Sequence, residues 1–309
     1  MSPLPTFGSS GDLLADRRYS YAKGAFDESD YEAAADLARQ ALDLAPRFAA
    51  GQALLGRALM ALGAREEAVA ALSTALTLEP DDPLGVRIDL AHLGALDADA
   101  AITESYVRSL FDDYAVRFDR HLIRSLKYRG PELIAGALRR AAARRMRDAR
   151  FNPVFDLGCG TGLMARALLG MAVRIEGVDL SPRMLAQAEK TGLYEALHEA
   201  DLVSFLQARE TGEAGLVVAA DVFVYMATLH AVFWESHRVL SRGGFFAFTV
   251  QAHQGDGFIL GEDARYAHGE RYLRDLAAAT GFAVVLFERV STREDRGRPV
   301  PGTLAVIER

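Results

Sequence analysis

Cysteine is almost missing from this chain of 309 residues: Cys159 is the only one, so no intramolecular disulfide can form. No apolar run approaches the ~20 residues of a membrane-spanning helix, and the first residues lack the basic and apolar regions of a secretory signal. Basic residues are not in excess either, since the formal net charge is -7. This charge argues against electrostatic capture of nucleic acid. We therefore expect a cytoplasmic protein without nucleic-acid or membrane partners.

An internal repeat is present near the N-terminus. Aligning "AADLARQALDLAPRF" with "AVAALSTALTLEPDD" places Ala34 over Ala68, Ala41 over Ala75 and Pro46 over Pro80, each 34 residues apart. This is the tetratricopeptide (TPR) period, in which small alanines let antiparallel helices approach and proline ends the second helix. The large aromatic residue of that pattern is missing, so a generic alanine-rich pair of helical hairpins stays open. We expect about two repeats and a capping helix, which would bind a protein partner or another copy of the chain.

The segment from Ala101 to Arg150 has helical spacing of apolar residues until Gly130 and Pro131 interrupt it. A second helix is expected to begin there with proline in its first turn. Six arginines lie between Arg139 and Arg150. Without interleaved aromatic residues they indicate the solvated face of an amphipathic helix rather than a nucleic-acid surface.

After Phe151 the pattern alternates between strands and helices, which predicts a mostly parallel sheet covered on both faces. Strands are expected at "VFDLG", "VRIEGVDL", "ALHEAD", "GLVVAAD", "GGFFAFTVQ", "FAVVLFERV" and "TLAVIER". The last two are joined without a helix, so they are predicted to form an antiparallel hairpin.

The stretch "FDLGCGTGLMARALL" carries glycines at 158, 160 and 162 between a strand and a helix, but Leu163 occupies the position of the third glycine of a dinucleotide loop. Asp156 precedes the loop, and Asp179 ends the next strand, where a carboxylate can accept both hydroxyls of a ribose. The spacing therefore favours an adenosyl ligand without a pyrophosphate.

These features resemble motif I of the class I S-adenosylmethionine-dependent methyltransferases. The resemblance implies a Rossmann-like, seven-stranded α/β fold and S-adenosylmethionine as the cofactor. It also implies that Asp156 helps to receive the ammonium group and that Asp201 faces the adenine, although a helix cap remains the alternative for Asp201. Cys159 is interpreted as a loop filler. The implied cofactor-binding residues are Asp156, Gly158, Cys159, Gly160, Gly162, Asp179, Leu180, Met184, Asp201, Leu202, Asp221, Tyr114 and Phe118.

The segment "LFDDYAVRFDRHLIRSLKYRGPELI" resembles the helical lid of bacterial tetratricopeptide-repeat methyltransferases. Tyr114 and Phe118 are expected to contact the cofactor, because aromatic faces attract its sulfonium, whereas Phe111 fits a core position better. The run from Tyr225 to Leu229 departs from the family pattern, in which a carboxylate is present. This departure places any acid-base role there in doubt.

Three residues are candidates for a general base: His253, and His268 with Tyr272, which would share a helical face. His121 is a fourth, and for each a structural role is the alternative. No residues have metal-ligand spacing, so no metal is expected.

The predicted organisation is a flexible tail (1–14), a TPR-like helical domain (15–100), a helical lid or linker (101–150) and a methyltransferase domain (151–309). We expect transfer of a methyl group to O, N, S or C of a small metabolite, or of a peptide docked by the repeats. The alternatives are a non-catalytic TPR scaffold that senses S-adenosylmethionine and, less favoured by the glycine spacing, a nicotinamide-dependent oxidoreductase.

Overall fold

The computed structural model describes residues 8–115, 127–295 and 297–309. The chain divides into two compact units, Met1–Leu110 and Phe111–Arg309. The expected lid segment therefore has residues in both units. No helix within the described ranges is long and apolar enough to cross a membrane.

The first unit is built from paired helices. They are α1 (Leu13–Asp27), α2 (Tyr31–Leu44), α3 (Ala49–Ala61), α4 (Arg65–Leu78), α5 (Val86–His92), a short 3-10 helix η1 (Ala98–Ala100) and the start of α6 (Glu104–Tyr114). The four alanines of the 34-residue period, Ala34, Ala41, Ala68 and Ala75, are fully buried. The aligned prolines follow the ends of α2 and α4. The predicted TPR-like helical region is thus confirmed.

Gly56 shows why small residues are needed in these repeats. A Cβ atom at this position would lie 2.5 Å from Cγ of Leu72, which is fully buried in α4. The backbone of α3 therefore approaches α4 as closely as a glycine permits, so this position cannot take even alanine without a shift of its neighbours.

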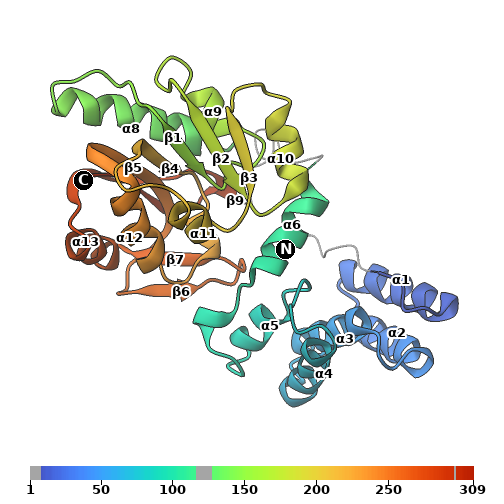
Figure 1. Ribbon diagram of the computed structural model, residues 1–309. Helices are drawn as coiled ribbons and strands as arrows, with labels where there is room; N and C mark the ends of the chain where they lie inside the picture. Colours follow the sequence, from blue (N-terminus) through green and yellow to red (C-terminus); the bar gives the residue numbers. More distant parts are fainter. Residues whose placement is uncertain (1–7, 116–126, 296) are drawn as a thin grey trace. The chain divides into compact units, whose positions relative to one another are not determined.

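The second unit is an α/β fold in which helices cover both faces of a sheet (Figure 1). Its strands are β1 (Val154–Leu157), β2 (Ile175–Asp179), β3 (Ala196–Glu199), β4 (Ala214–Ala219), β5 (Leu240–His253), β6 (Phe258–Leu260), β7 (Tyr266–Gly269), β8 (Ala283–Val290), β9 (Glu294–Asp295), β10 (Arg298–Pro299) and β11 (Gly302–Glu308). Its helices are α8 (Gly130–Arg144), α9 (Leu163–Ala167), α10 (Pro182–Glu189), α11 (Leu202–Gln207), the 3-10 helix η2 (Phe223–Tyr225), α12 (His230–Val239) and α13 (Glu270–Ala279).

The main path of the sheet has the order β3-β2-β1-β4-β5-β11-β8. The strands from β3 to β5 are parallel, whereas β11 lies antiparallel between β5 and β8. This arrangement confirms the predicted parallel sheet and its terminal antiparallel hairpin. The helix α11 and the short β9–β10 ladder were not predicted. Nor was the β6–β7 hairpin, which extends the sheet through parallel pairing of β7 with β5.

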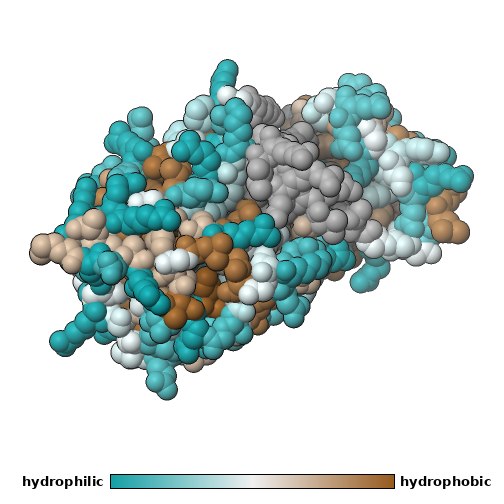
Figure 2. Space-filling model, turned by 90° about the horizontal axis from the view of Figure 1, so that it is seen from above, coloured by the Kyte–Doolittle hydropathy of each residue, from teal (hydrophilic) through white to brown (hydrophobic). Residues whose placement is uncertain are grey.

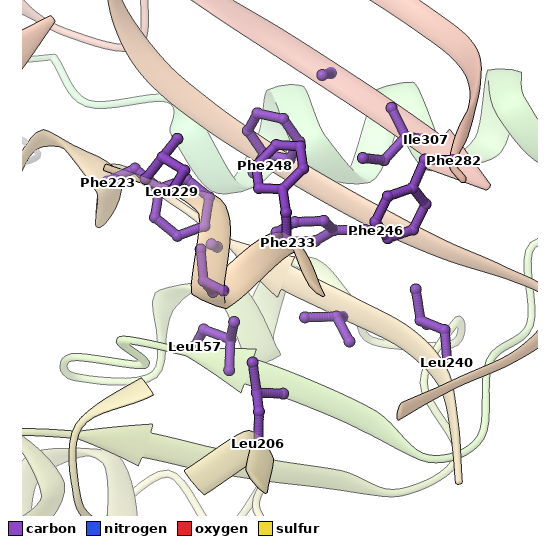
Figure 3. Packing of buried hydrophobic residues seen from close by; sticks show 14 of the residues in the cluster. Leu157, Leu206, Phe223, Leu229, Phe233, Leu240, Phe246, Phe248, Phe282 and Ile307 are labelled. Atoms are coloured by element: carbon purple, nitrogen blue, oxygen red, sulfur yellow. The ribbon is translucent and has the colours of Figure 1, made fainter. Parts of the chain in front are cut away.

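The core beneath α11, α12 and α13 is rich in phenylalanine (Figure 3). Phe246 and Phe248 point from one face of β5 and meet Phe233 of α12 edge to face, with ring centroids 5.3 and 5.2 Å apart. The intervening residues of β5 enter the second core, beneath α8 and α9. Each fully buried phenylalanine stabilises the fold by about 1.5–3 kcal/mol, so β5, with both faces buried, anchors the sheet.

The exposure of the arginine-rich segment agrees with its interpretation as the solvated face of an amphipathic helix. All six arginines between Arg139 and Arg150 are exposed, and several hold the edge of the sheet, as in the 2.6 Å ion pair between Arg140 and Glu288. Hydrophilic residues are widespread on the face in Figure 2, with apolar residues among them. Exposed apolar side chains such as Leu169 are ordinary in globular proteins.

The glycine at position 56 provides a test of the repeat packing. We expect Gly56→Ala to lower the free energy of unfolding by about 1–3 kcal/mol, because the added methyl group overpacks the contact with Leu72. Gly24→Ala in α1 is the matched control: nothing lies within 4 Å of its Cβ position, so the substitution should stabilise by up to about 1 kcal/mol. Urea unfolding followed by far-ultraviolet circular dichroism measures both. Equal stability of the two variants would contradict the packing argument.

Candidate functional site

The glycine loop joins β1 to α9 and has a backbone that few other residues tolerate. Gly158, Gly160 and Gly162 have φ values of 65°, 53° and 90°, in the left-handed region. A Cβ atom on Gly158 would also lie 2.5 Å from Cγ2 of Val222, which follows β4. Glycine is therefore needed for two reasons at position 158, and the loop packs directly against the end of β4.

Asp179 fastens this loop to the end of β2. Its Oδ2 accepts a hydrogen bond from the backbone N–H of Gly160, and its Oδ1 accepts one from the N–H of Ser181, both at 2.9 Å. Burial raises the pKa of the Asp179 carboxyl against the opposing effect of these two bonds. A carboxylate has about four acceptor sites, so Asp179 can still accept bonds from ligand hydroxyls.

Asp156 lies inside the fold behind the loop rather than open to solvent. The Tyr194 hydroxyl donates a 2.6 Å hydrogen bond to its Oδ2. Burial raises the pKa of Asp156 to about 7, the Tyr194 bond opposes this rise, and the charge of Asp179 adds to it. The ring of Tyr194 fills the space beside two glycines, since Cβ atoms on Gly162 and Gly177 would lie 3.2 and 2.8 Å from it. No local pattern around Tyr194 indicated this contact.

The side chains of Cys159 and Met184 are buried. Cys159 is buried, its N–H donates to the carbonyl of Val178, and burial raises the pKa of its thiol well above the usual value. This disfavours the reactive thiolate. Met184 is fully buried in α10, whereas Leu180 and Leu202 are partly exposed.

Asp201 acts as the N-cap of α11, because its Oδ1 accepts a 2.9 Å bond from the N–H of Ser204. Asp201 therefore has the capping role that the sequence left as the alternative. The second carboxylate oxygen is not used by this bond.

The end of α6 carries the aromatic residues of the expected lid. Phe111 packs edge to face against Tyr225, with centroids 5.4 Å apart. Asp112 accepts a 2.5 Å hydrogen bond from the Ser181 hydroxyl, which ties this end of α6 to the start of α10. Tyr114 is half-buried at the last position of α6. The candidates Phe118 and His121 lie outside the described residues.

Asp221 follows β4 in a strained backbone conformation, with φ of 56°. Its carboxylate accepts hydrogen bonds from the hydroxyls of Thr249 and Thr292 and from Nη1 of Arg293, at 2.9 to 3.1 Å. The Arg293 and Asp221 side chains are only 5% and 14% exposed. Thr249, Thr292 and Arg293 were missed by sequence reasoning because they come from distant segments.

The expectation that His268 and Tyr272 share a helical face is wrong. His268 belongs to β7, and the extended backbone of Gly269 precedes the first residue of α13. The two rings nevertheless stack at 5.8 Å. His268 is fully buried beside the Ala227 carbonyl, and burial lowers its pKa to about 4. Such a group has little capacity to remove a proton from a substrate at neutral pH.

His253 ends β5 and its ring nitrogens contact the backbone of Gly255 and Gly257. It lines a hollow of about 1050 Å³ whose lining includes none of the described cofactor candidates. Within the parts of the chain that the structure describes, no cluster of histidine, cysteine and acidic residues could hold a metal ion.

The Arg293–Asp221 pair yields a stability prediction. We expect Arg293→Met to destabilise the second unit by about 3–5 kcal/mol, because it leaves the buried Asp221 carboxylate without the cation that is hydrogen-bonded to it. Arg271→Met is the control, since Arg271 is 75% exposed and should change stability by less than about 0.5 kcal/mol. The single tryptophan, Trp234, lies in α12 and reports urea unfolding of this unit by fluorescence. A loss below about 1 kcal/mol would contradict the importance of the pair.

Comparisons with known families and curated proteins cover both parts of the chain. Residues 155–248 match the family described as "Methyltransferase domain", and residues 25–87 match "Tetratricopeptide repeat". Methyltransferase-like protein 27 of Homo sapiens is 36% identical over 88 residues, which are 28% of this chain and 34% of that protein. A ubiquinone biosynthesis O-methyltransferase of Thiobacillus denitrificans is 29% identical over 111 residues, 35% of this chain and 47% of that protein. The chain thus spans less than half the length of these curated relatives.

Solved structures show the same fold at low identity. The 1,6-didemethyltoxoflavin-N1-methyltransferase of Burkholderia thailandensis, which contains S-adenosylhomocysteine, has a TM-score of 0.52 at 17% identity and matches over 69% of this chain and 93% of its own. The magnesium protoporphyrin IX methyltransferase of Synechocystis PCC 6803, also with S-adenosylhomocysteine, has a TM-score of 0.52 at 16% identity and matches over 67% of this chain and 99% of its own. Residues 155–248 therefore belong to the methyltransferase domain family, on the fold of class I S-adenosylmethionine-dependent methyltransferases, and the chain joins this domain to tetratricopeptide repeats.

Proposed function

We propose that this protein is an S-adenosylmethionine-dependent methyltransferase. The observation that carries the proposal is the glycine loop itself: three glycines in the left-handed region, fastened at Gly160 by the carboxylate that ends β2. The names of the matched relatives support the same activity, and two structural neighbours contain the demethylated cofactor.

Three parts of the fold would each bind a different part of the cofactor: the end of β2, the glycine loop and the start of α11. Asp179 would accept hydrogen bonds from the ribose hydroxyls with the acceptor sites that Gly160 and Ser181 leave open. The glycine loop, which has no side chains at three positions, would admit the methionine tail, with Asp156 behind it as the charge that favours the ammonium group. Asp201 and Leu202, at the start of α11, would lie at the adenine.

The reaction would be an in-line displacement in which the sulfur–methyl bond breaks while a bond from the acceptor to the methyl carbon forms. The cofactor supplies an activated methyl group, so alignment and exclusion of water provide much of the rate. A proton is lost only if the acceptor atom carries one. The burial of His268 and its low pKa make it a poor base, and we assign it a structural role under Tyr272.

The acceptor is proposed to be a small molecule, as it is for the two structural neighbours by their names. A peptide held by the repeats is the second candidate, because residues 25–87 match a family of repeat modules. If the repeats dock the acceptor, substitutions on their exposed surface should raise KM and leave kcat unchanged.

Isothermal titration calorimetry with S-adenosylmethionine tests the proposed function. We expect Asp179→Ala to weaken binding by about 10- to 100-fold, because hydrogen bonds to a charged group are lost together with the support of the loop. Asp275→Ala on the exposed face of α13 is the matched control and should bind as the wild type does. The proposal fails if the wild-type protein ignores S-adenosylmethionine, and quenching of NADH fluorescence would then favour the oxidoreductase.

The pKa of Asp156 predicts how cofactor binding depends on pH. The charged carboxylate favours the ammonium group, so affinity should fall as pH drops from 8 to 6, with a midpoint near the Asp156 pKa of about 7. The Tyr194 bond lowers this pKa, so Tyr194→Phe should raise it, move the midpoint to higher pH and weaken binding at neutral pH, whereas the two proteins should bind alike at high pH, where Asp156 is charged in both. Tyr21→Phe, in the first unit, serves as the control. Affinity that is constant over this pH range would contradict the role of Asp156.

A further inference from the structure

A second charged cluster adjoins the glycine loop, and of its residues only Asp221 was among the cofactor candidates. It contains Asp221 and Arg293 together with Gln251 at the end of β5, and Asp263 and Arg265 in the β6–β7 turn. It lies close to the loop because Val222, the residue after Asp221, would touch a Cβ atom on Gly158. The cluster is therefore placed beside the methyl donor of the proposed function.

Arg293 is incompletely paired although it is almost entirely buried. Its Nη1 donates to Asp221 and its Nη2 donates to Oε1 of Gln251 at 2.7 Å. Its Nε is buried and has no hydrogen-bond partner within the described residues. An unpaired donor on a buried cation costs free energy, so this edge of the guanidinium is suited to receive an additional acceptor atom.

Asp263 marks where an anion fits. One of its carboxylate oxygens, Oδ2, accepts a 3.2 Å hydrogen bond from Nε2 of Gln251 and lies 3.9 Å from Nη2 of Arg293. These contacts are long compared with the 2.7 to 2.9 Å of a charge-assisted bond. The side chain is 34% exposed and belongs to a turn, so it holds the position loosely.

Arg265 supplies a second cation. It hydrogen-bonds to Tyr225 and interacts electrostatically with Asp263 and Asp221. The two guanidiniums thus face two carboxylates, of which only Asp221 is tightly held. Removal of the loosely held Asp263 would leave one uncompensated positive charge in a partly buried site, where attraction for an anion is stronger than at the open surface.

We propose that Arg265, Arg293 and Gln251 form a binding subsite for a carboxylate group of the methyl acceptor, and that Asp263 occupies this subsite until the acceptor displaces it. The entering carboxylate accepts from the Gln251 amide and from the free Nε of Arg293, while Arg265 balances its charge. This inference rests on the proposed methyltransferase function for the identity of the ligand, but the subsite itself is defined by the described residues alone.

Titration calorimetry with succinate as the anion, and with succinamide as its neutral counterpart, tests the subsite. We expect Asp263→Ala to bind succinate about tenfold more tightly than the wild type, because the competing internal carboxylate is gone. Arg265→Gln added to this variant should reverse the gain. Succinamide should bind to none of these proteins with comparable affinity.

Two matched variants control for changes of overall charge. Asp256→Ala and Arg271→Gln remove exposed charges near the same hairpin and should leave succinate binding unchanged. Asp263→Asn replaces Asp263→Ala if the latter unfolds. The proposal is overturned if loss of the Asp263 charge does not tighten binding, or if succinamide binds as well as succinate. Titrations with and without S-adenosylhomocysteine separate this outcome from failure of the proposed function, which shows as absence of heat with S-adenosylhomocysteine itself.

Discussion

The two backbone hydrogen bonds to Asp179 hold the site together. The N–H of Gly160 comes from the loop after β1 and that of Ser181 from the turn after β2, so a single carboxylate joins the ends of two adjacent parallel strands. The loop can meet this carboxylate only because its glycines adopt left-handed conformations. The loop also contacts Val222, which follows β4, because β1 lies between β2 and β4 in the sheet.

Buried charge is concentrated where these strands end. Asp156, Asp179 and Asp221 are each removed from water to a large extent, which is costly unless specific donors surround the charged form. The donors differ among the three: a tyrosine hydroxyl for Asp156, backbone N–H groups for Asp179, and two hydroxyls with a guanidinium for Asp221. The phenylalanine-rich core under β5 stabilises the sheet that holds these groups in place. The apolar residues that stabilise the sheet therefore lie along its strands, whereas the buried carboxylates lie at the ends of the strands.

The elements that were predicted well are those whose residues specify them locally. The seven strands on the main path of the sheet, the small alanines of the repeats and the terminal hairpin follow from period, composition and connection length. The β6–β7 hairpin was missed because its strands are short and β7 is completed by parallel pairing with β5, which no local pattern encodes. The supposed helical face of His268 and Tyr272 failed for a related reason, because β7 ends one residue before α13 begins.

For this protein, sequence alone determined the 34-residue repeat, the order along the chain of the seven strands on the main path of the sheet, and a glycine loop with Asp179 beyond it. Each of these depends on residues that are close in the chain or on a spacing that backbone geometry requires. Only the tertiary structure decided which side chains meet. Tyr194 reaches Asp156 across 38 residues and Arg293 reaches Asp221 across 72, and such partners are selected by the packing of the sheet rather than by any local pattern. The same packing placed Asp263 beside Arg293, and so revealed an anion position that the sequence did not indicate.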